Sequence, residues 1–191
     1  MVAASAGCRL ETAEAPAPAE PTPAVVARAL GACTSGDTDA GIATLDAALD
    51  ADARSADALT ARGLCHWTRF AADSARADAE AAHADLSAAI EAARAGPDRP
   101  PATPLDRVYS HRAFVALALD PDDWSATVAD LTSAVRLAPR DPTHRLDRAV
   151  AHRAAGDTAA ARRDLRRFLA LAPPADAARR GLAEQMLADL E

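Results

Sequence analysis

The side chains that could bind a metal ion or take part in catalysis are scattered along this chain. The five histidines are His66, His83, His111, His144 and His152. They form neither a His-Glu-x-x-His motif nor a paired His/Cys set with the spacing of metal ligands. Cys65 and His66 are adjacent, which on a helix points their side chains about 100° apart. A metal site built from Cys33, Cys65 and His66 is therefore not expected.

Motifs for nucleophilic or phosphate chemistry are also missing from the sequence. It contains no Gly-x-Ser-x-Gly elbow, and it has no lysine to follow a glycine-rich phosphate loop. Three carboxylates cluster at Asp120, Asp122 and Asp123, where the end of one helix and the capping of the next account for them. We therefore expect no enzyme, no bound metal and no cofactor.

Arginine shows the most regular pattern of the charged residue types. All 21 basic residues are arginine, and although the net charge is −7, arginines outnumber acids within 136–180. Two i, i+4 rows, Arg162/Arg166 and Arg163/Arg167, predict a continuous basic strip on one helix. The strip is either a solvated outer face or a contact for an acidic protein or an anionic lipid. Nucleic acid is not an expected partner, because aromatic residues that could stack on bases are not interleaved with the basic ones and the net charge repels phosphate.

The elements that position these residues follow from a repeated pattern of small and apolar residues. It occurs four times, at 41–49, 82–90, 127–135 and 161–169, with leucines at 45, 86, 131 and 165. The last spacing is 34 residues, and the spacings of 41 and 45 are the same period with insertions of 7 and 11. The apolar half of the composition is mostly alanine, and no strand-like alternation is present. The sequence therefore predicts an all-α stack of helical repeats.

Turn residues support the same repeat. Gly36 and Gly156 each precede an Asp-Thr pair, so that the glycine can end one helix and the aspartate can cap the next. Pro139 and Pro173, again 34 residues apart, stop the second helices of the last two repeats. Together these features resemble the tetratricopeptide repeat, in which two antiparallel helices fill 34 residues.

This resemblance covers most of the chain and implies its organisation. It implies a right-handed superhelical stack of four helical hairpins, at about 23–55, 56–96, 103–141 and 142–175. Residues 1–22 are expected to form an Ala/Pro/Glu-rich linker or disordered tail, 95–104 a hinge or protruding loop, and 176–191 a capping helix. In the second helices the small residues of the family correspond to Gly41, Ala82, Thr127 and Ala161. In the first helices they correspond to Ala29, Gly63 and Ala149, with Val115 in the third repeat, while Arg28, Arg62 and Arg148 stand where an apolar residue is usual.

The resemblance also implies a concave groove lined by the first helices, and this groove is the expected binding site. The positions that face it are Thr60, Trp67, Tyr109, Arg112, Thr143, Val150 and Arg153. Arginine binds carboxylates through two parallel hydrogen bonds, and Trp and Tyr supply large contact areas. The lysine and asparagine clamp of some family members cannot exist here, because the chain has neither residue.

The leading functional hypothesis is a non-enzymatic adaptor that binds a partner protein or peptide, with a partner identity that the sequence does not give. The first alternative is a self-assembling structural or envelope-assembly subunit that uses its terminal helix and the basic strip. The sequence does not decide between a monomer and a homo-oligomer. An enzyme or a metal-binding protein is the third.

The cysteines bear on the compartment. Ala4-Ser5-Ala6-Gly7-Cys8 resembles the end of a bacterial lipoprotein signal peptide, which implies lipidation of Cys8 and location at the cell envelope; the alternative is a cytoplasmic tail with an incidental cysteine. Cys33 and Cys65 fall on first helices of neighbouring repeats. We expect them to be small reduced core residues, with a disulfide as the alternative in an oxidising compartment.

Overall fold

The computed structural model describes residues 23–96 and 101–190, and this described part is built from helices without any strand. The helices are α1 (Pro23–Thr34), α2 (Thr38–Ala51), α3 (Ala56–Asp73), α4 (Arg76–Ala95), α5 (Leu105–Leu119), α6 (Ser125–Leu137), α7 (Pro142–Ala154), α8 (Thr158–Leu171) and α9 (Ala177–Ala188). The predicted all-α class is confirmed. Of the expected tail and the expected connector, residues 1–22 and 97–100 lie outside the described residues.

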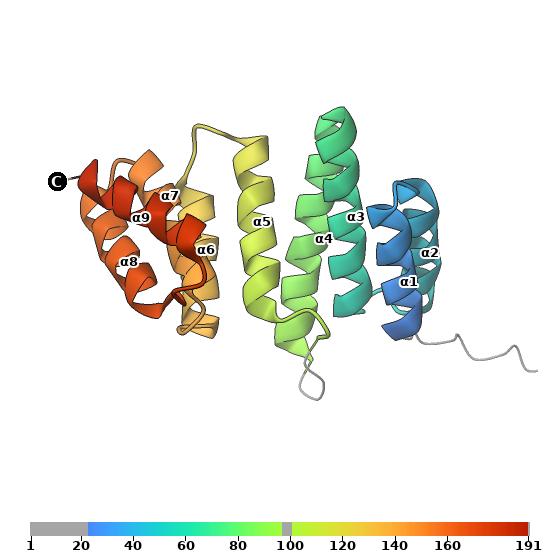
Figure 1. Ribbon diagram of the computed structural model, residues 1–191. Coiled ribbons are helices and arrows are strands. Elements are labelled where there is room, and N and C mark those ends of the chain that lie inside the picture. The colour runs from blue at the N-terminus through green and yellow to red at the C-terminus, as the bar shows by residue number, and fades with distance from the viewer. Residues whose placement is uncertain (1–22, 97–100, 191) are drawn as a thin grey trace, which may run out of the picture.

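Consecutive helices pair as hairpins, and the hairpins stack in chain order. The pairs α1/α2, α3/α4, α5/α6 and α7/α8 pack against each other, and each second helix also packs against the next first helix. Figure 1 shows the resulting row of helices, with α9 against the last hairpin. A hairpin of this length cannot bury its apolar face alone, so stacking builds the continuous core.

The predicted turns are confirmed at the two Gly-Asp sites. Gly36 and Gly156 have φ of +99° and +81°, a backbone conformation that favours glycine. The next residue then caps the following helix: Asp37 accepts a hydrogen bond from the Ala40 amide, and Asp157 accepts one from the Ala160 amide.

The four repeated leucines form the centre of the core, and all are at most 1% exposed. The small residue four positions before each leucine lies against the crossing residue of the paired first helix. Thr127 Oγ1 donates a hydrogen bond to the Ala113 carbonyl at 3.2 Å, which makes Ala113 the crossing residue of the third hairpin. The sequence-based choice of Val115 is therefore wrong by two residues. Val115 is also apolar and buried, so apolarity alone does not separate the two positions.

An arginine precedes the crossing residue in every hairpin, and in three of them it binds an aspartate of the paired helix. The pairs are Arg62–Asp85, Arg112–Asp130 and Arg148–Asp164, each with Nε and Nη2 bonds of 2.7–2.9 Å to the two carboxylate oxygens. Each aspartate directly precedes a repeated leucine. These pairs explain the arginines that stand at a usually apolar position, because each guanidinium head binds a nearly buried carboxylate. We call the three pairs the arginine ladder.

The arginine ladder also joins neighbouring hairpins. The Nη1 atoms of Arg62, Arg112 and Arg148 donate to side chains of the preceding second helix. The acceptors are Asp46 at 2.7 Å, Ser87 at 3.1 Å and Thr132 at 3.3 Å. The first hairpin differs, because Thr44 replaces the aspartate and Arg28 is exposed.

The longer helices of the second hairpin carry one additional set of charged contacts. Arg69 lies seven residues after Arg62 and binds Asp78 and Asp39, each seven residues before the corresponding partner of Arg62. Two turns of helix separate the two sets, so they lie on the same faces. Two sets of charged contacts, one from Arg62 and one from Arg69, therefore join α3 to α2 and α4.

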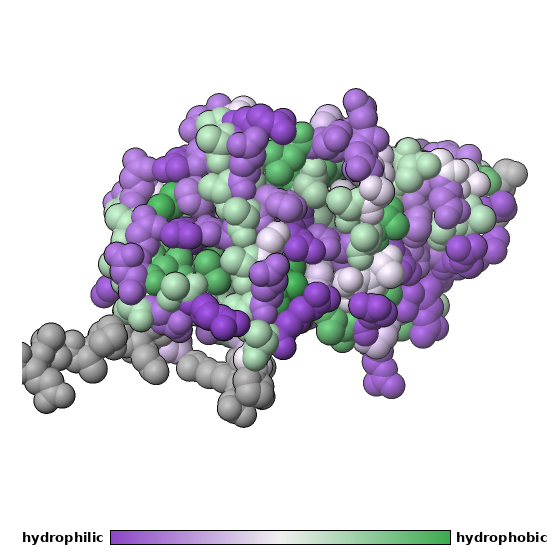
Figure 2. Space-filling model, turned by 180° about the vertical axis from the view of Figure 1, so that it is seen from behind, coloured by the Kyte–Doolittle hydropathy of each residue, from purple (hydrophilic) through white to green (hydrophobic). Residues whose placement is uncertain are grey.

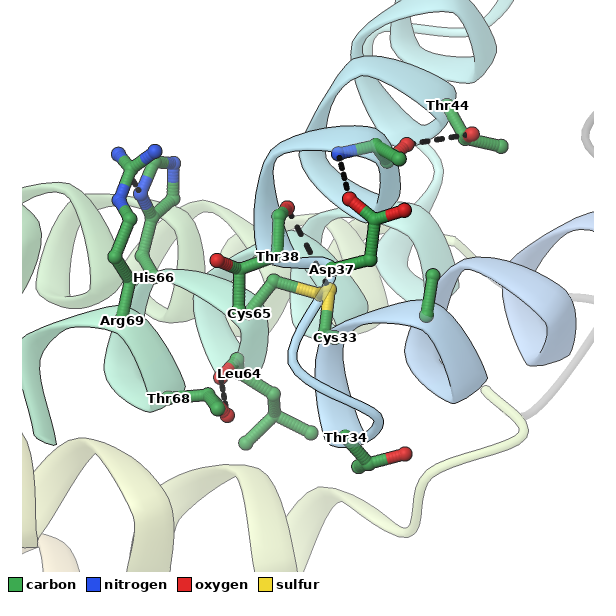
Figure 3. Close-up of a disulfide and its surroundings, with 12 residues drawn as sticks. Cys33, Thr34, Asp37, Thr38, Thr44, Leu64, Cys65, His66, Thr68 and Arg69 are labelled. Carbon is green, nitrogen blue, oxygen red and sulfur yellow. Dashed lines mark hydrogen bonds between the residues drawn. A yellow bond between two sulfur atoms is a disulfide. The ribbon is translucent and has the colours of Figure 1, made fainter. Parts of the chain in front are cut away.

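A disulfide joins α1 to α3. Cys33 and Cys65 are buried and bonded, with their Cα atoms 5.4 Å apart (Figure 3). The structure therefore has the disulfide that the sequence left as the alternative. The bridge crosses from the first helix of one hairpin to the first helix of the next, beside the start of α2.

The C-terminal end of the stack is covered by α9. Phe168 stands where the other second helices have alanine, and it is fully buried in a cluster with Leu165, Ala183 and Met186. The large ring fills the space between α8 and the terminal helix.

Figure 2, viewed from behind, shows hydrophilic and hydrophobic residues side by side over the stack. No helix in the described residues has the length and apolar character that a membrane span requires.

Candidate functional site

The first helices present one face that is not covered by a paired second helix. On α5 this face carries Arg107, His111, Phe114 and Ala118, and on α7 it carries Thr143, Asp147, Val150 and Ala154. Spacings of three and four residues place each set on one side of its helix. The two sets occupy matching positions, counted from the crossing residues Ala113 and Ala149. The same register therefore sets the face in both hairpins.

Three hollows follow one another along this face. A pocket of 340 Å³ lies between α3 and α5 and is lined by Trp67, His111, Phe114, Leu117 and Ala118. A pocket of 330 Å³ between α5 and α7 shares His111 and Phe114 with it. A third, of 430 Å³, lies between α7 and α9 and is lined by Val150, Arg153, Ala154, Leu182 and Met186. We call these three pockets together the first-helix groove.

Large apolar side chains are exposed along the first-helix groove. Phe114 is 42% exposed, Val150 42% and Leu182 50%, and they come from α5, α7 and α9. Trp67 of α3 extends the row and stacks on Phe70. A continuous exposed apolar row of this kind marks a surface that binds something, whereas a single exposed apolar residue does not.

The expected groove residues divide into two groups. Trp67, Thr143, Val150 and Arg153 line the first-helix groove. Thr60 and Tyr109 are buried in the core, and Arg112 belongs to the arginine ladder.

Thr60, Tyr109 and Arg112 lie outside the groove for two physical reasons. The position three residues before each crossing residue is buried in every hairpin, and Thr60 occupies it in α3. In the third hairpin the two-residue register error places Tyr109 and Arg112 on the groove face, where Arg107, His111 and Phe114 lie instead. Asp147 was missed as well. It stands two residues before Ala149, at the position that matches His111, and this position was not counted among the groove positions although the register of α7 was correct.

Asp147 is the charged group of the groove whose environment is least favourable. Burial raises the pKa of Asp147 to about 6, although the positive charges of His144 and Arg179 act in the opposite direction. Among the described residues, no hydrogen bond or ion pair reaches its carboxylate. Burial also lowers the pKa of His111, and Arg107 and His144 lower it further.

A buried histidine lies at the end of the same pocket. His144 Nε2 is 2.8 Å from Asp106 Oδ2, and His144 Nδ1 is 3.3 Å from Ser110 Oγ. These are the residue types of a hydrolase triad, but Ser110 lies within helix α5, where its backbone amides are engaged in the helix and do not form an oxyanion hole. The arrangement is that of a buried histidine with both ring nitrogens hydrogen-bonded.

One set of side chains in the described part could hold a metal ion. Asp106, Asp141 and His144 each offer a ligand atom, and these atoms lie within 4.8 Å of one another. The sequence does not predict this cluster, because Asp106 lies on a different helix from His144 and far from Asp141 and His144 in the chain. Their positions are also explained without an ion, since Asp106 binds His144 and Asp141 caps α7 through the Thr143 amide.

Comparison with known proteins identifies the repeat. The tetratricopeptide repeat family profile matches residues 115–188. The segment from α5 to α9 is therefore similar to the tetratricopeptide repeat. The structure of YrrB, described as a TPR protein with an unusual peptide-binding site, aligns with a TM-score of 0.62 at 15% identity over 87% of this chain and 84% of that one. A structure of Pseudomonas aeruginosa pilF aligns over 87% of both chains at 18% identity, with a TM-score of 0.37. No curated protein matches the sequence significantly.

The similarity to tetratricopeptide repeats agrees with the fold and suggests a general function in protein–protein interaction. Proteins of this family are generally non-enzymatic adaptors, and their fold is a scaffold for protein–protein interaction. Stacked repeats create an extended concave surface for that purpose.

The predicted basic strip lies on a second helix of the stack. Arg163, Arg166 and Arg167 are exposed on α8, and Arg162 is partly buried. The nearby Asp164 binds Arg148, so it does not neutralise the strip. Asp176 likewise pairs with Arg179. Contact of this strip with an acidic protein or an anionic lipid remains a prediction. Cys8, the predicted lipidation site, lies outside the described residues.

Proposed function

We propose that this protein is a non-enzymatic adaptor that binds an extended segment of a partner protein in the first-helix groove. The observation that carries the proposal is the exposed apolar row of Phe114, Val150 and Leu182, which continues the line of Trp67. These side chains offer contact area on the first helices α3, α5 and α7 and on the terminal helix α9, and little rotamer freedom is lost at the aromatic ones. The peptide-binding site described for YrrB, which shares the fold, supports this mode of binding.

We further propose that the protein works in an oxidising compartment, attached to a membrane through Cys8. The disulfide Cys33–Cys65 supports the compartment, because structural disulfides persist where thiols are not kept reduced. The small residues before Cys8 support the attachment. A lipid on Cys8 and a linker of about fifteen residues would leave the groove free to meet its partner.

The test is site-specific photo-crosslinking in the native cell. Phe114→p-benzoylphenylalanine places the reactive group in the groove, and Leu137→p-benzoylphenylalanine places it on an equally exposed position of α6 as the matched control. We expect a protein adduct that forms from position 114 and not from position 137. The same adducts from both positions would contradict a groove site. An adduct of the protein with itself would favour the self-assembling alternative.

A further inference from the structure

The pocket between α5 and α7 contains a carboxylate that the fold leaves without a partner. Asp147 lines this 330 Å³ pocket, and no hydrogen bond or ion pair within the described residues reaches it. A desolvated charge without a partner opposes folding. The buried aspartates of the arginine ladder are each paired closely with an arginine, whereas Asp147 is partly buried and has no such pair. Asp147 therefore departs from the pattern of the molecule.

Most of the charged groups around Asp147 already bind other residues, and the remaining ones do not pair with its carboxylate. They are His144 and Asp141 from α7 and its cap, Arg107 and His111 from α5, and Arg179 from α9. His144 is bound to Asp106, Asp141 to the Thr143 amide, and Arg179 to Asp176 at 2.8 Å. His111 tends to remain neutral because burial lowers its pKa. Arg107 remains as the single exposed cation in the lining.

An aromatic ring stands in the same pocket. Phe114 lines it together with Asp147 and is 42% exposed, so part of its surface is open to a ligand. A carboxylate and an aromatic ring in one pocket together bind a planar cation, because the carboxylate accepts its hydrogen bonds and the ring attracts its charge. Guanidinium suits such a site better than ammonium, since it is more weakly hydrated and stacks on rings.

We propose that this pocket receives an arginine side chain of the partner segment, with Asp147 as its hydrogen-bond acceptor and Phe114 against its guanidinium or its apolar stem. The inference rests on the proposed function and specifies the chemistry of the partner. The volume fits one side chain, because 330 Å³ is at the lower end of the range of ligand pockets. The apolar pockets on either side then take the flanking residues of the segment.

The test uses a short capped peptide as the probe. The ¹⁵N-labelled full chain is titrated with acetyl-Ala-Leu-Arg-Leu-Ala-amide and with the same peptide carrying citrulline, a neutral isostere, in place of arginine. Amide shifts of residues 107–118 and 143–150 report binding. The variants are Asp147→Asn and, as a matched loss of one exposed carboxylate on α2, Asp50→Asn.

We expect the arginine peptide to bind at least tenfold more tightly than the citrulline peptide. This difference should disappear in Asp147→Asn and remain in Asp50→Asn. Binding by the wild type should weaken roughly tenfold between pH 7.5 and pH 5, because Asp147 becomes neutral as the pH falls below its pKa of about 6. The pH dependence should be absent in Asp147→Asn. Equal affinity for the two peptides, or an unchanged preference in Asp147→Asn, would overturn the inference.

Thermal unfolding separates a binding role from a structural one. The folded protein holds the pKa of Asp147 above its unfolded value, so ionisation above pH 6 opposes folding, and the effect vanishes well below pH 4. Asp147→Asn should therefore unfold at a higher temperature than the wild type at pH 8, and at nearly the same temperature at pH 3.5. A lower unfolding temperature at pH 8 would identify Asp147 as a structural residue.

Failure of this inference and failure of the proposed function have different signatures. If position 114 still crosslinks a partner while the arginine preference is missing, the groove binds a partner of different chemistry and only the arginine site is wrong. If neither peptide binds and position 114 captures nothing, both proposals are wrong.

Discussion

At the scale of single residues, Gly41 shows how one position of a repeat can become restricted. The matching residues of the other hairpins are Ala82, Thr127 and Ala161, so a side chain is normally tolerated. In the first hairpin a Cβ at position 41 would stand 2.8 Å from the Ala29 carbonyl and would also clash with the sulfur of Cys33. The disulfide occupies the space that a side chain fills elsewhere. Glycine is therefore required here for close approach and not for backbone freedom.

Two glycine substitutions test this account with opposite expected signs. Gly41→Ala should lower the free energy of unfolding by about 1–3 kcal/mol, because the neighbouring backbone must shift. Gly31→Ala, in α1, should raise it by about 0.5–1 kcal/mol, since nothing lies within 4 Å of the new methyl group and alanine favours the helix. Urea unfolding followed by circular dichroism measures both. A stabilising Gly41→Ala would show that α1 and α2 do not approach this closely.

The groove residues show what single-residue patterns in the sequence could and could not predict. Trp67, Thr143 and Val150 were placed on the groove face because Gly63 and Ala149 are small residues that fix the register. In α5, Ala113 and Val115 are both apolar, and the register that separates them depends on contacts with Thr127 far along the chain. The sequence alone therefore left His111 and Phe114 unidentified.

At the scale of helices, the arginine ladder replaces apolar contact by paired charges between α3 and α4, α5 and α6, and α7 and α8. The sequence contained its signal. An aspartate directly precedes the leucine at 86, 131 and 165, and an arginine precedes each crossing residue. This signal was not recognised, because the two partners lie 16 to 23 residues apart and on different helices. Spacing within one helix does not reveal a pairing across two.

The ladder predicts a large effect of removing one arginine. Arg112→Met should lower the free energy of unfolding by about 3–5 kcal/mol, because Asp130 keeps its nearly buried charge and loses its partner. Arg28→Met is the matched control. Arg28 occupies the same position of the first hairpin, is exposed and faces Thr44 in place of an aspartate, so its loss should change stability by less than about 0.5 kcal/mol.

A second pair of variants separates charge from packing. In Arg112→Met with Asp130→Leu, no unpaired charge remains, and most of the lost stability should return. Arg112→Lys should remain destabilised, since lysine cannot form the two parallel bonds to Asp130. Equal stability of Arg112→Met and Arg28→Met would show that the ladder does not stabilise the stack.

At the scale of the whole molecule, the repeat period predicted the fold class well. The leucines at 45, 86, 131 and 165 follow the period because each occupies the same place in the core, and the tetratricopeptide repeat profile matches residues 115–188. The disulfide was left open for a physical reason. Whether two cysteines meet depends on how two hairpins stack, and the sequence gives no Cβ distance.

The disulfide predicts a redox-dependent stability. It closes a loop of 32 residues, for which the chain-entropy estimate is about 3–4 kcal/mol. A reducing agent should therefore lower the melting temperature of the wild type and leave that of Cys33→Ala with Cys65→Ala unchanged. Cys8 is present in both chains and serves as the internal control. Equal melting temperatures of the wild type with and without the reducing agent, after alkylation has verified the reduced thiols, would contradict a stabilising bridge.

The contacts between neighbouring hairpins are unevenly distributed, and this has a consequence for cooperativity. The first and second hairpins are joined by the disulfide and by two arginines, Arg62 and Arg69, whereas the third and fourth are joined without a covalent bond, by Arg148 and by the contacts of His144 with Asp106 and Ser110. In a linear stack, each hairpin is stabilised mainly by its neighbours. We therefore expect the covalently joined N-terminal pair to unfold as one cooperative block, and the C-terminal hairpins, with the groove between α5 and α9, to open first.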